Sequence, residues 1–585
     1  MVEPLSRIRS PSERLRLPFH RRVQRTLNAL GPFGWHAVYF ASICLVASWI
    51  LYGVGARAGA KRGENLGYLD AVFLGVTSAT GAGLGNVALS DLDKIQQIVA
   101  FLLILFGGHL WVSACVVNVQ RAFLARKIHK RCLEEMKKKK QRLEDERRQL
   151  QLQDQQGKVE GDEELEKQGI TASSSEAADV SSLSPKLVSP GHHDASSQCT
   201  AFDLVGMETP FDKLSLGDTP TDHDTLSALT TLCWLLPAYM TFFQLLGMIC
   251  IGSYITRHGM DIVAVNNLNP WWYALFNSVS AFNNSGMSLL DANMSPYATR
   301  GALVVWTQCV LIIAGNAGFP IFLRTILLFL PKNAGTKLLL DETHGRRLFP
   351  YLFGFREFNW LLSMLLVLNL TSWTVFEALA PYTPSLANLN LGQRFLSGLF
   401  QGLSVRSGGF GIVAIRELHV GVLLTYVVML YISAFPIDVT RSPPGSAWNF
   451  IKQQLRGLMR AGDLRYLASA VWLICVIDGI GEDEVFGVVF EVASAFGCVG
   501  VSFGALGDTR LALVGDWRGG SKLVLAGIML WGRVREARRG ILTEWGRETR
   551  ERTWYGGIKE GTHDMGIGGK EIDEEENVVV RVEIV

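Results

Sequence analysis

The sequence has few charged side chains and no cysteine arrangement that would bind a metal. Only 19% of the 585 residues are charged, 48% are hydrophobic, and the mean hydropathy is +0.21. The nine cysteines form no CxxC pair and most lie in apolar segments, so we interpret them as small buried hydrophobes rather than a disulfide framework. Residues 1–30 are rich in Arg and contain no secretory signal. This composition is typical of a polytopic membrane protein.

The sequence also lacks the residues of an enzyme site. Its apolar segments contain no cluster of His, Asp or Glu, and no folded soluble domain is evident. A membrane enzyme or receptor built on such a chain would need one or the other. We therefore expect no enzyme activity and no cofactor.

The stretch from Asn269 to Asn293, NPWWYALFNSVSAFNNSGMSLLDAN, has an apolar half too short to cross a bilayer. Trp271–Phe282 is apolar and aromatic, whereas a spanning helix needs about 20 residues. A small, polar half, Asn283–Ser288, follows, and longer apolar segments flank the whole stretch. This pattern predicts a re-entrant loop that lines a watery cavity. Gly286 would permit backbone angles that aim carbonyls into a pore, as in potassium filters.

The order of span, re-entrant loop and span occurs four times, which indicates internal repetition. The other three loops are Tyr68–Val87 around Gly83, Phe395–Val413 around Gly409 and Val485–Phe503 around Gly500. The expected spans are residues 36–54, 98–117, 229–255, 303–330, 360–380, 421–435, 467–480 and 522–531. The last of these is too short to cross unless its flanks extend it.

These patterns divide the chain into nine segments. We expect an N-terminal segment, 1–34; repeat 1, 35–120; a charged insertion, 121–227; repeat 2, 228–331; a linker, 332–357; repeat 3, 358–436; a second linker, 437–463; repeat 4, 464–532; and a tail, 533–585. The insertion begins with charges of alternating sign, which predict a solvated helix. From Gly157 to Asp224 it is rich in Ser, Asp and Gly, which predicts disorder.

Lys and Arg gather after the second span of each repeat, for example from Arg121 to Arg131 and from Arg533 to Arg539. Cytoplasmic loops prefer these residues. We therefore expect both termini and the insertion to be cytosolic, and the re-entrant loops to enter the membrane from outside.

The sequence resembles the fungal Trk-type potassium transporters, a superfamily shared with bacterial Trk and Ktr subunits and plant high-affinity cation transporters. The likeness covers about residues 30–120 and 228–535. The stretches that carry it are Asn269–Asn293, Gln96–Ser113 (QQIVAFLLILFGGHLWVS), Leu403–Val413 (LSVRSGGFGIV), Phe490–Gly504 (FEVASAFGCVGVSFG) and Ser521–Leu530 (SKLVLAGIML). The resemblance implies an all-α chain whose four membrane–pore loop–membrane repeats surround a single pseudo-fourfold cation pore, as in potassium channels.

The resemblance also implies which residues form the selectivity filter. One glycine comes from each repeat: Gly83, Gly286, Gly409 and Gly500. The flanking positions are Thr80, Asn284, Ser285, Ser407, Gly408, Cys498 and Val499. In the plant relatives the first-loop position separates sodium-preferring from potassium-preferring members, so the glycine there argues for potassium. The alternative is that these glycines only let helices pack closely.

Three charged residues lie at membrane depth and are expected to modulate the pore. We expect Arg406 to brace its loop against a carboxylate such as Glu491. Lys522 matches a family position at which a cation limits ion occupancy below the filter. The alternative for Arg406 and Lys522 is an interfacial charge that extends outward to water. Asp291 would either concentrate cations at the outer mouth or be a plain solvated loop residue.

Together, the resemblance implies a multi-pass plasma-membrane protein that takes up potassium, driven by the membrane potential. The alternative is a sodium-permeable or potassium–sodium symporting protein. The expected partners are potassium ions and the lipid bilayer, with no nucleic acid and no metal beyond the transported ion. Bacterial relatives pair as dimers, so a homo-oligomer is a further expectation.

Overall fold

The computed structural model describes residues 31–57, 66–167, 221–342, 344–383, 386, 389–432, 461–505 and 510–539. These residues form helices and loops, with no strand among them, so the all-α prediction is confirmed for the described chain. They belong to two compact units: residues 1–116 with 232–585, and residues Val117–Thr231. The segment 1–30, most of the linker 437–463 and the tail beyond 539 lie outside the described residues.

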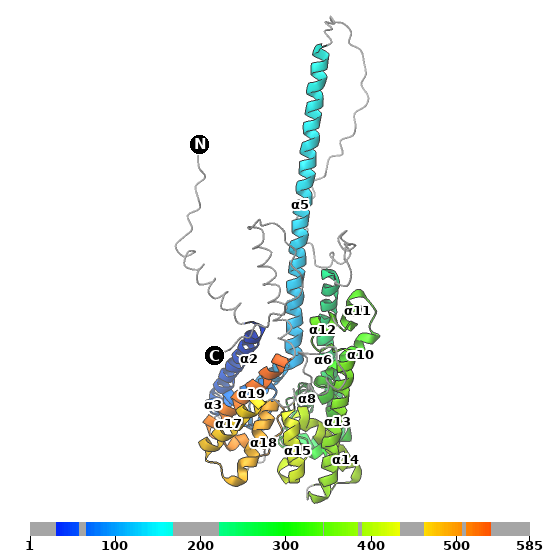
Figure 1. The fold of residues 1–585 in the computed structure, drawn as a ribbon. Helices are drawn as coiled ribbons and strands as arrows, with labels where there is room; N and C mark the ends of the chain where they lie inside the picture. Colours follow the sequence, from blue (N-terminus) through cyan, green and yellow to red (C-terminus); the bar gives the residue numbers. More distant parts are fainter. Residues whose placement is uncertain are drawn as a thin grey trace, which may run out of the picture. The chain divides into compact units, whose positions relative to one another are not determined.

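The first unit contains four successive groups of helices in the same order (Figure 1). Group 1 is α2 (Gly31–Arg57), α3 (Tyr68–Thr80) and α4 (Lys94–Gly107); group 2 is α6 (Asp222–His258), α8 (Pro270–Phe282), α9 (Ala302–Gly315) and α10 (Phe319–Phe329); group 3 is α13 (Phe355–Leu379), α14 (Leu391–Leu403) and α15 (Val420–Tyr431); group 4 is α17 (Ala461–Asp478), α18 (Val485–Gly497) and α19 (Gly519–Arg539). Within group 2, α7 (Met260–Ala264) lies between α6 and α8, and α11 (Ala334–Leu340) and α12 (His344–Leu348) lie between groups 2 and 3.

The second helix of each group, α3, α8, α14 or α18, is 13 residues long. A helix of this length extends only about 20 Å, which is less than a bilayer core. Local sequence fixes where two of them begin. The Asn269 side chain accepts the backbone N–H groups of Trp271 and Trp272 at the start of α8. Asn390 and Gln393 form a capping box at the start of α14.

Three helices are long and apolar enough to cross a membrane, α2, α6 and α13, and two bent pairs bring the number to five within the described residues. The spans predicted as continuous at 98–117 and 303–330 are each broken: α4 meets α5 at 58° and α9 meets α10 at 80°. Gly108 separates the first pair. In the second, Asn316 leaves the helical conformation with φ −135° and ψ −107°, and Pro320 stands in the first turn of α10, where its missing N–H breaks no helical bond.

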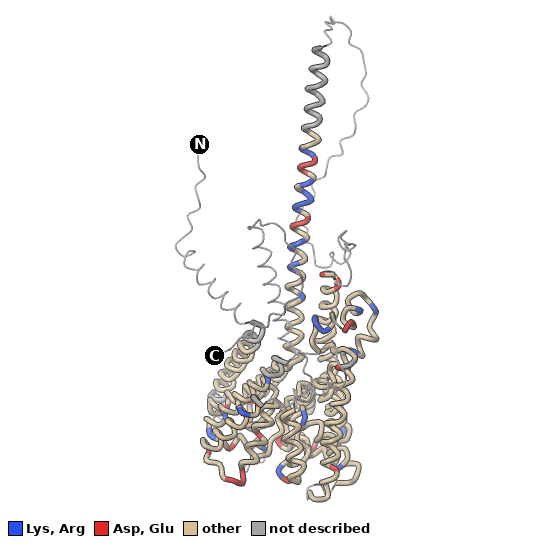
Figure 2. The backbone as a smooth tube through the Cα atoms, in the orientation of Figure 1, with Lys and Arg blue, Asp and Glu red and all other residues tan. Residues whose placement is uncertain are grey.

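The second unit contains most of α5, His109–Lys167. Figure 2 shows basic and acidic residues along this helix, as the alternating charge predicted, whereas the helices of the first unit carry few. The helix extends to Lys167, beyond the Gly157 at which disorder was expected to begin. Within this unit Asp222 pairs with Arg131 and lies 3.8 Å from Lys127. Residues 168–220 lie outside the described chain.

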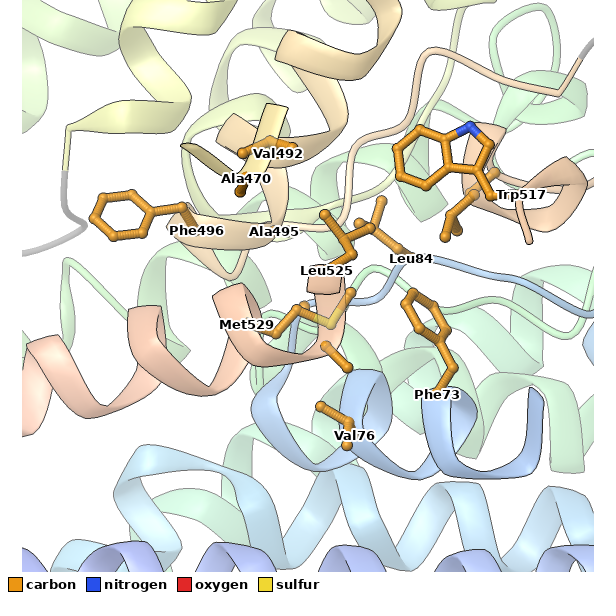
Figure 3. Packing of buried hydrophobic residues seen from close by; sticks show 14 of the residues in the cluster. Phe73, Val76, Leu84, Ala470, Val492, Ala495, Phe496, Trp517, Leu525 and Met529 are labelled. Atoms are coloured by element: carbon orange, nitrogen blue, oxygen red, sulfur yellow. The ribbon is translucent and has the colours of Figure 1, made fainter. Parts of the chain in front are cut away.

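The four groups of the first unit pack on one another in a closed cycle. The last part of each group contacts the short helix of the next: α4 packs on α8, α9 on α14, α15 on α18, and α19 on α3. The contact between groups 4 and 1 is a buried hydrophobic cluster (Figure 3). It includes Phe73, Val76 and Leu84 of group 1 and Val492, Phe496, Leu525 and Met529 of group 4.

Glycines allow these helices to approach the ends of the short helices. An added Cβ would lie 1.9 Å from the Ala79 carbonyl oxygen at Gly107 and 1.6 Å from the Phe282 carbonyl oxygen at Gly315. Real Cβ atoms do not approach backbone this closely, so each glycine is required by the packing.

Replacing Gly315 by Ala should therefore destabilise the protein by about 1–3 kcal/mol through overpacking. The matched control is Gly527→Ala in α19, where an added Cβ would meet nothing within 4 Å. Thermal unfolding of the detergent-purified protein measures the difference. Equal melting temperatures for the two variants would show that the close approach at Gly315 is not needed.

Candidate functional site

The loops that follow the four short helices each contain a glycine with a left-handed backbone. The φ angles are 66° at Gly83, 71° at Gly286, 78° at Gly409 and 98° at Gly500. This region favours glycine over any residue with a Cβ. The four residues singled out from the sequence therefore all have a positive φ.

The loops of groups 1, 2 and 4 touch at Gly83. A Cβ added there would lie 1.6 Å from the Ser285 carbonyl oxygen and 3.5 Å from the Gly500 Cα. A Cβ added at Gly500 would lie 2.5 Å from the Ala82 carbonyl oxygen. Backbone therefore meets backbone at this point, and no side chain separates the loops.

The loop of group 3 completes the contact. A Cβ added at Gly286 would lie 2.5 Å from the Gly409 Cα, and one added at Gly409 would lie 2.1 Å from the Val499 carbonyl oxygen. Loop 1 thus touches loop 2, loop 2 touches loop 3, loop 3 touches loop 4 and loop 4 touches loop 1. The four glycines converge, together with the backbone carbonyls beside them.

The flanking residues of groups 1 and 2 are largely buried and shape the turns. The Thr80 hydroxyl donates to the Val76 carbonyl at 2.7 Å, as helical threonines do. Asn284 has a φ of 55°, and its side chain donates to the Phe282 carbonyl. The buried Ser285 hydroxyl has no hydrogen-bond partner in the described part of the chain.

The flanking residues of groups 3 and 4 adopt two different turns. Ser407 and Gly408 belong to a single π-turn, Ser404–Gly408, in which the Ser404 hydroxyl donates to the Phe410 carbonyl at 2.6 Å. Cys498 ends α18 with a φ of 50°, and its thiol donates to the Met529 carbonyl at 3.4 Å.

A cavity lies at the carboxyl ends of all four short helices. Its lining consists of Thr80, Gly81, His109, Asn283, Asn284, Asn316, Arg406, Ser407, Gly497, Cys498 and Arg533. The carboxyl end of a helix carries a partial negative charge, so four such charges face this space. The residues at both helix breaks, His109 and Asn316, line it too.

Two arginines and a histidine line the same cavity. Arg406, expected from the sequence to modulate the pore, is only 3% exposed. Arg533 donates to the Gly107 carbonyl at the end of α4 and lies over the Phe40 ring. Neither Arg533 nor His109 was singled out from the sequence. Arg533 belongs to a basic run that was assigned as a whole to the cytosol, and for His109 the signal was the Gly107–Gly108 pair directly before it, which can break a helix.

The expected pairing of Arg406 with Glu491 is not found. The hydrogen bonds of the fully buried Glu491 stay within its own group: its Oε1 accepts from Ser502, from Phe503 N at 3.2 Å and from Leu513 N at 3.3 Å. The sequence could not reveal this because the donors come from a loop whose path depends on the whole assembly.

Lys522 lies far from the cavity to which the resemblance assigned it. Its Nζ is 2.7 Å from the Asp70 carboxylate in the first turn of α3, at the opposite end of that helix from the cavity-lining Thr80. The Asp70 carboxylate also accepts from the Asn86 side chain. Lys522 therefore joins groups 4 and 1.

Asp291 is neither a plain solvated residue nor a free carboxylate. It accepts hydrogen bonds from Ser90 at 2.5 Å and from Asn266 at 2.6 Å, and lies 3.9 Å from Arg510. Arg510 also pairs with Asp91 at 3.1 Å. The loops of groups 1, 2 and 4 are thus connected by polar contacts. Among the described residues, no group of three or more His, Cys, Asp and Glu could hold a metal ion.

The Asp70–Lys522 pair should show strong coupling. Asp70→Asn and Lys522→Gln are each expected to lower stability, whereas the double variant should lose less than the sum, with a coupling of about 1–2 kcal/mol. Thermal unfolding of all four proteins measures it. The exposed pair Arg300–Asp261 serves as the control, with little coupling expected. Purely additive losses at Asp70 and Lys522 would contradict the pairing.

A family model described as "TrkH: Cation transport protein" matches residues 213–442. Potassium transport protein 1 of Schizosaccharomyces pombe is 30% identical over 54% of this chain and 40% of its own length. Potassium transporter TRK1 of Candida albicans is 31% identical over 49% of this chain and 30% of its own length. The low-affinity potassium transport protein of Saccharomyces cerevisiae is 29% identical over 53% and 42%.

The chain thus spans less than half the length of these relatives. Among solved structures, the potassium transporter TrkH from Vibrio parahaemolyticus aligns over 86% of this chain and 82% of that chain, with a TM-score of 0.44 and 15% identity. The matches to the family model and to the fungal proteins agree with the apolar helices and with the resemblance seen in the sequence. Residues 213–442 are therefore similar to a family of cation transport proteins, and about half of the chain is similar to fungal potassium transporters.

Proposed function

We propose that this chain mediates potassium uptake across the plasma membrane through a selectivity filter at Gly83, Gly286, Gly409 and Gly500. The observation that carries the proposal is the convergence of four glycine-containing loops, each with a left-handed glycine and each touching its neighbours through backbone. The names of the fungal relatives, which are potassium transporters, support the choice of ion.

The proposed mechanism relies on main-chain oxygens. Rings of backbone carbonyls replace the hydration shell of a potassium ion, and ion binding then requires no charged side chain. The carbonyls of Ala82, Ser285 and Val499 already lie beside the neighbouring glycines. A bound monovalent cation would take its ligands from such groups.

The cavity below the loops would act on the same ion. The carboxyl ends of the four short helices attract a cation, whereas the guanidinium groups of Arg406 and Arg533 repel it. These two effects oppose each other, so we infer that the ion resides in the loops and passes through the cavity without a long stay.

The membrane potential would supply the driving force, about 2.3 kcal/mol per charge per 100 mV. The distribution of Lys and Arg supports cytosolic termini and loops that enter from outside. The proposed partners are the potassium ion, the lipid bilayer and a second copy of the chain. The following test distinguishes potassium uptake from sodium permeation.

Replacing Gly286 by Ser should reduce the ratio of rubidium to sodium uptake at least about tenfold, because a Cβ there would displace the Gly409 backbone. The measurement is uptake of both ions in a host deficient in potassium uptake. Gly53→Ser is the control, since a Cβ at that position in α2 meets nothing within 4 Å. Cell-surface amount is measured for each variant.

The wild-type protein should restore rubidium uptake and prefer rubidium over sodium. Surface expression without uptake would refute the transport proposal. Equal uptake of rubidium and sodium by the wild-type protein would refute potassium selectivity and favour a sodium-permeable transporter.

A further inference from the structure

Glu491 organises the chain that follows the fourth glycine. It is on α18, is fully buried, and its Oε1 accepts three hydrogen bonds from that chain. One donor is the backbone N–H of Phe503, three residues after Gly500. The Ser502 hydroxyl, another donor to Glu491, itself accepts from the N–H groups of Gly504 and Leu513. One carboxylate oxygen thus holds Ser502, Phe503 and Leu513.

Gln401 accepts a corresponding hydrogen bond in group 3. It lies on α14 and is fully buried, and its Oε1 accepts the backbone N–H of Ile412 at 3.0 Å. Ile412 is three residues after Gly409, as Phe503 is three residues after Gly500. Two groups therefore use a side-chain acceptor on the short helix for the same backbone donor.

In group 1, a side chain rather than a backbone N–H connects this position to the short helix. The residue three positions after Gly83 is Asn86, whose side chain donates to the Asp70 carbonyl at 3.1 Å and to the Asp70 carboxylate at 3.2 Å. The short helix α3 again holds the third residue after the glycine. Two groups thus supply an acceptor for the same backbone N–H, and group 1 holds the same position through a side chain, which indicates a common requirement rather than accidents of packing.

The requirement follows from the cost of a buried backbone N–H without an acceptor. Among the described residues, the chain that directly follows each glycine is not helical and pairs with no strand. Without an acceptor on the short helix, it would shift until its N–H groups found other partners, and the preceding carbonyls would shift with it. Carbonyl spacing is one basis on which a filter separates potassium from the smaller sodium ion.

We propose that Glu491 and Gln401 are positioning residues that hold the chain after Gly500 and Gly409, and that they thereby maintain the discrimination between potassium and sodium. This inference rests on the proposed function, since it assigns a supporting role at the same filter. The residues act through hydrogen bonds that they accept, and they do not touch the ion.

The test measures rubidium and sodium uptake, with surface amounts, for Glu491→Leu, Glu491→Gln and Gln401→Leu in the host deficient in potassium uptake. The two leucine variants remove the acceptor and should lower the rubidium-to-sodium ratio at least about fivefold, the change that the loss of a single hydrogen bond supports. Glu491→Gln keeps an acceptor oxygen at the same place and should retain the wild-type ratio.

Each leucine variant has a control on its own helix. Gln393→Leu removes a glutamine that accepts a backbone N–H in the first turn of α14, and Glu484→Leu removes a carboxylate just before α18. Both should leave the ratio unchanged. A general loss of helix stability would lower the surface amount of all four leucine variants. It would not change the rubidium-to-sodium uptake ratio of the protein that still reaches the surface.

A wild-type ratio in Gln401→Leu and Glu491→Leu, at normal surface amounts, would overturn the inference while leaving the proposed function intact. If Glu491→Leu does not reach the surface, the ratio of Gln401→Leu alone tests the inference. This variant removes a single hydrogen bond and should disturb folding less. Equal loss in Glu491→Gln and Glu491→Leu would also overturn it, since the charge would then matter rather than the accepted bonds. Absence of rubidium uptake by the wild-type protein would instead refute the proposed function.

Discussion

The structure depends on the approach of four backbone loops so close that only glycine fits where they meet. A Cβ at Gly83 or Gly409 would stand 1.6 Å or 2.1 Å from a carbonyl oxygen of the next loop. A left-handed backbone at each of these positions adds a second reason for glycine. Steric exclusion of side chains is what leaves backbone against backbone where the loops meet.

The rest of the fold brings these loops together and keeps them there. Short helices of 13 residues end beside the loops, and the last part of each group packs on the short helix of the next. The cycle closes through the hydrophobic cluster between groups 4 and 1 and through the Asp70–Lys522 pair. Breaks after Gly107 and Gly315 turn the helices at the cavity, where the carboxyl ends of the short helices meet two arginines.

Much of this could be predicted from local sequence. A short apolar run followed by small polar residues and a glycine marked all four loops, and the helical class followed from the apolar spans. What the sequence could not predict depended on distant partners. The close approach of Gly107 and Gly315 to the ends of α3 and α8 at the two helix breaks arises only in the assembled fold, and Lys522 pairs with Asp70, which is 452 positions away. Glu491 was noticed as a buried charge, but its partners lie in a loop that composition cannot place.

The most direct test of the central claim is to locate the ion itself. Crystals of the protein grown in rubidium would be measured at the rubidium absorption edge, and the anomalous difference map would be calculated. The account predicts a peak enclosed by the backbone carbonyls beside Gly83, Gly286, Gly409 and Gly500. A well-occupied rubidium peak elsewhere in the membrane region, with none among these loops, would contradict it.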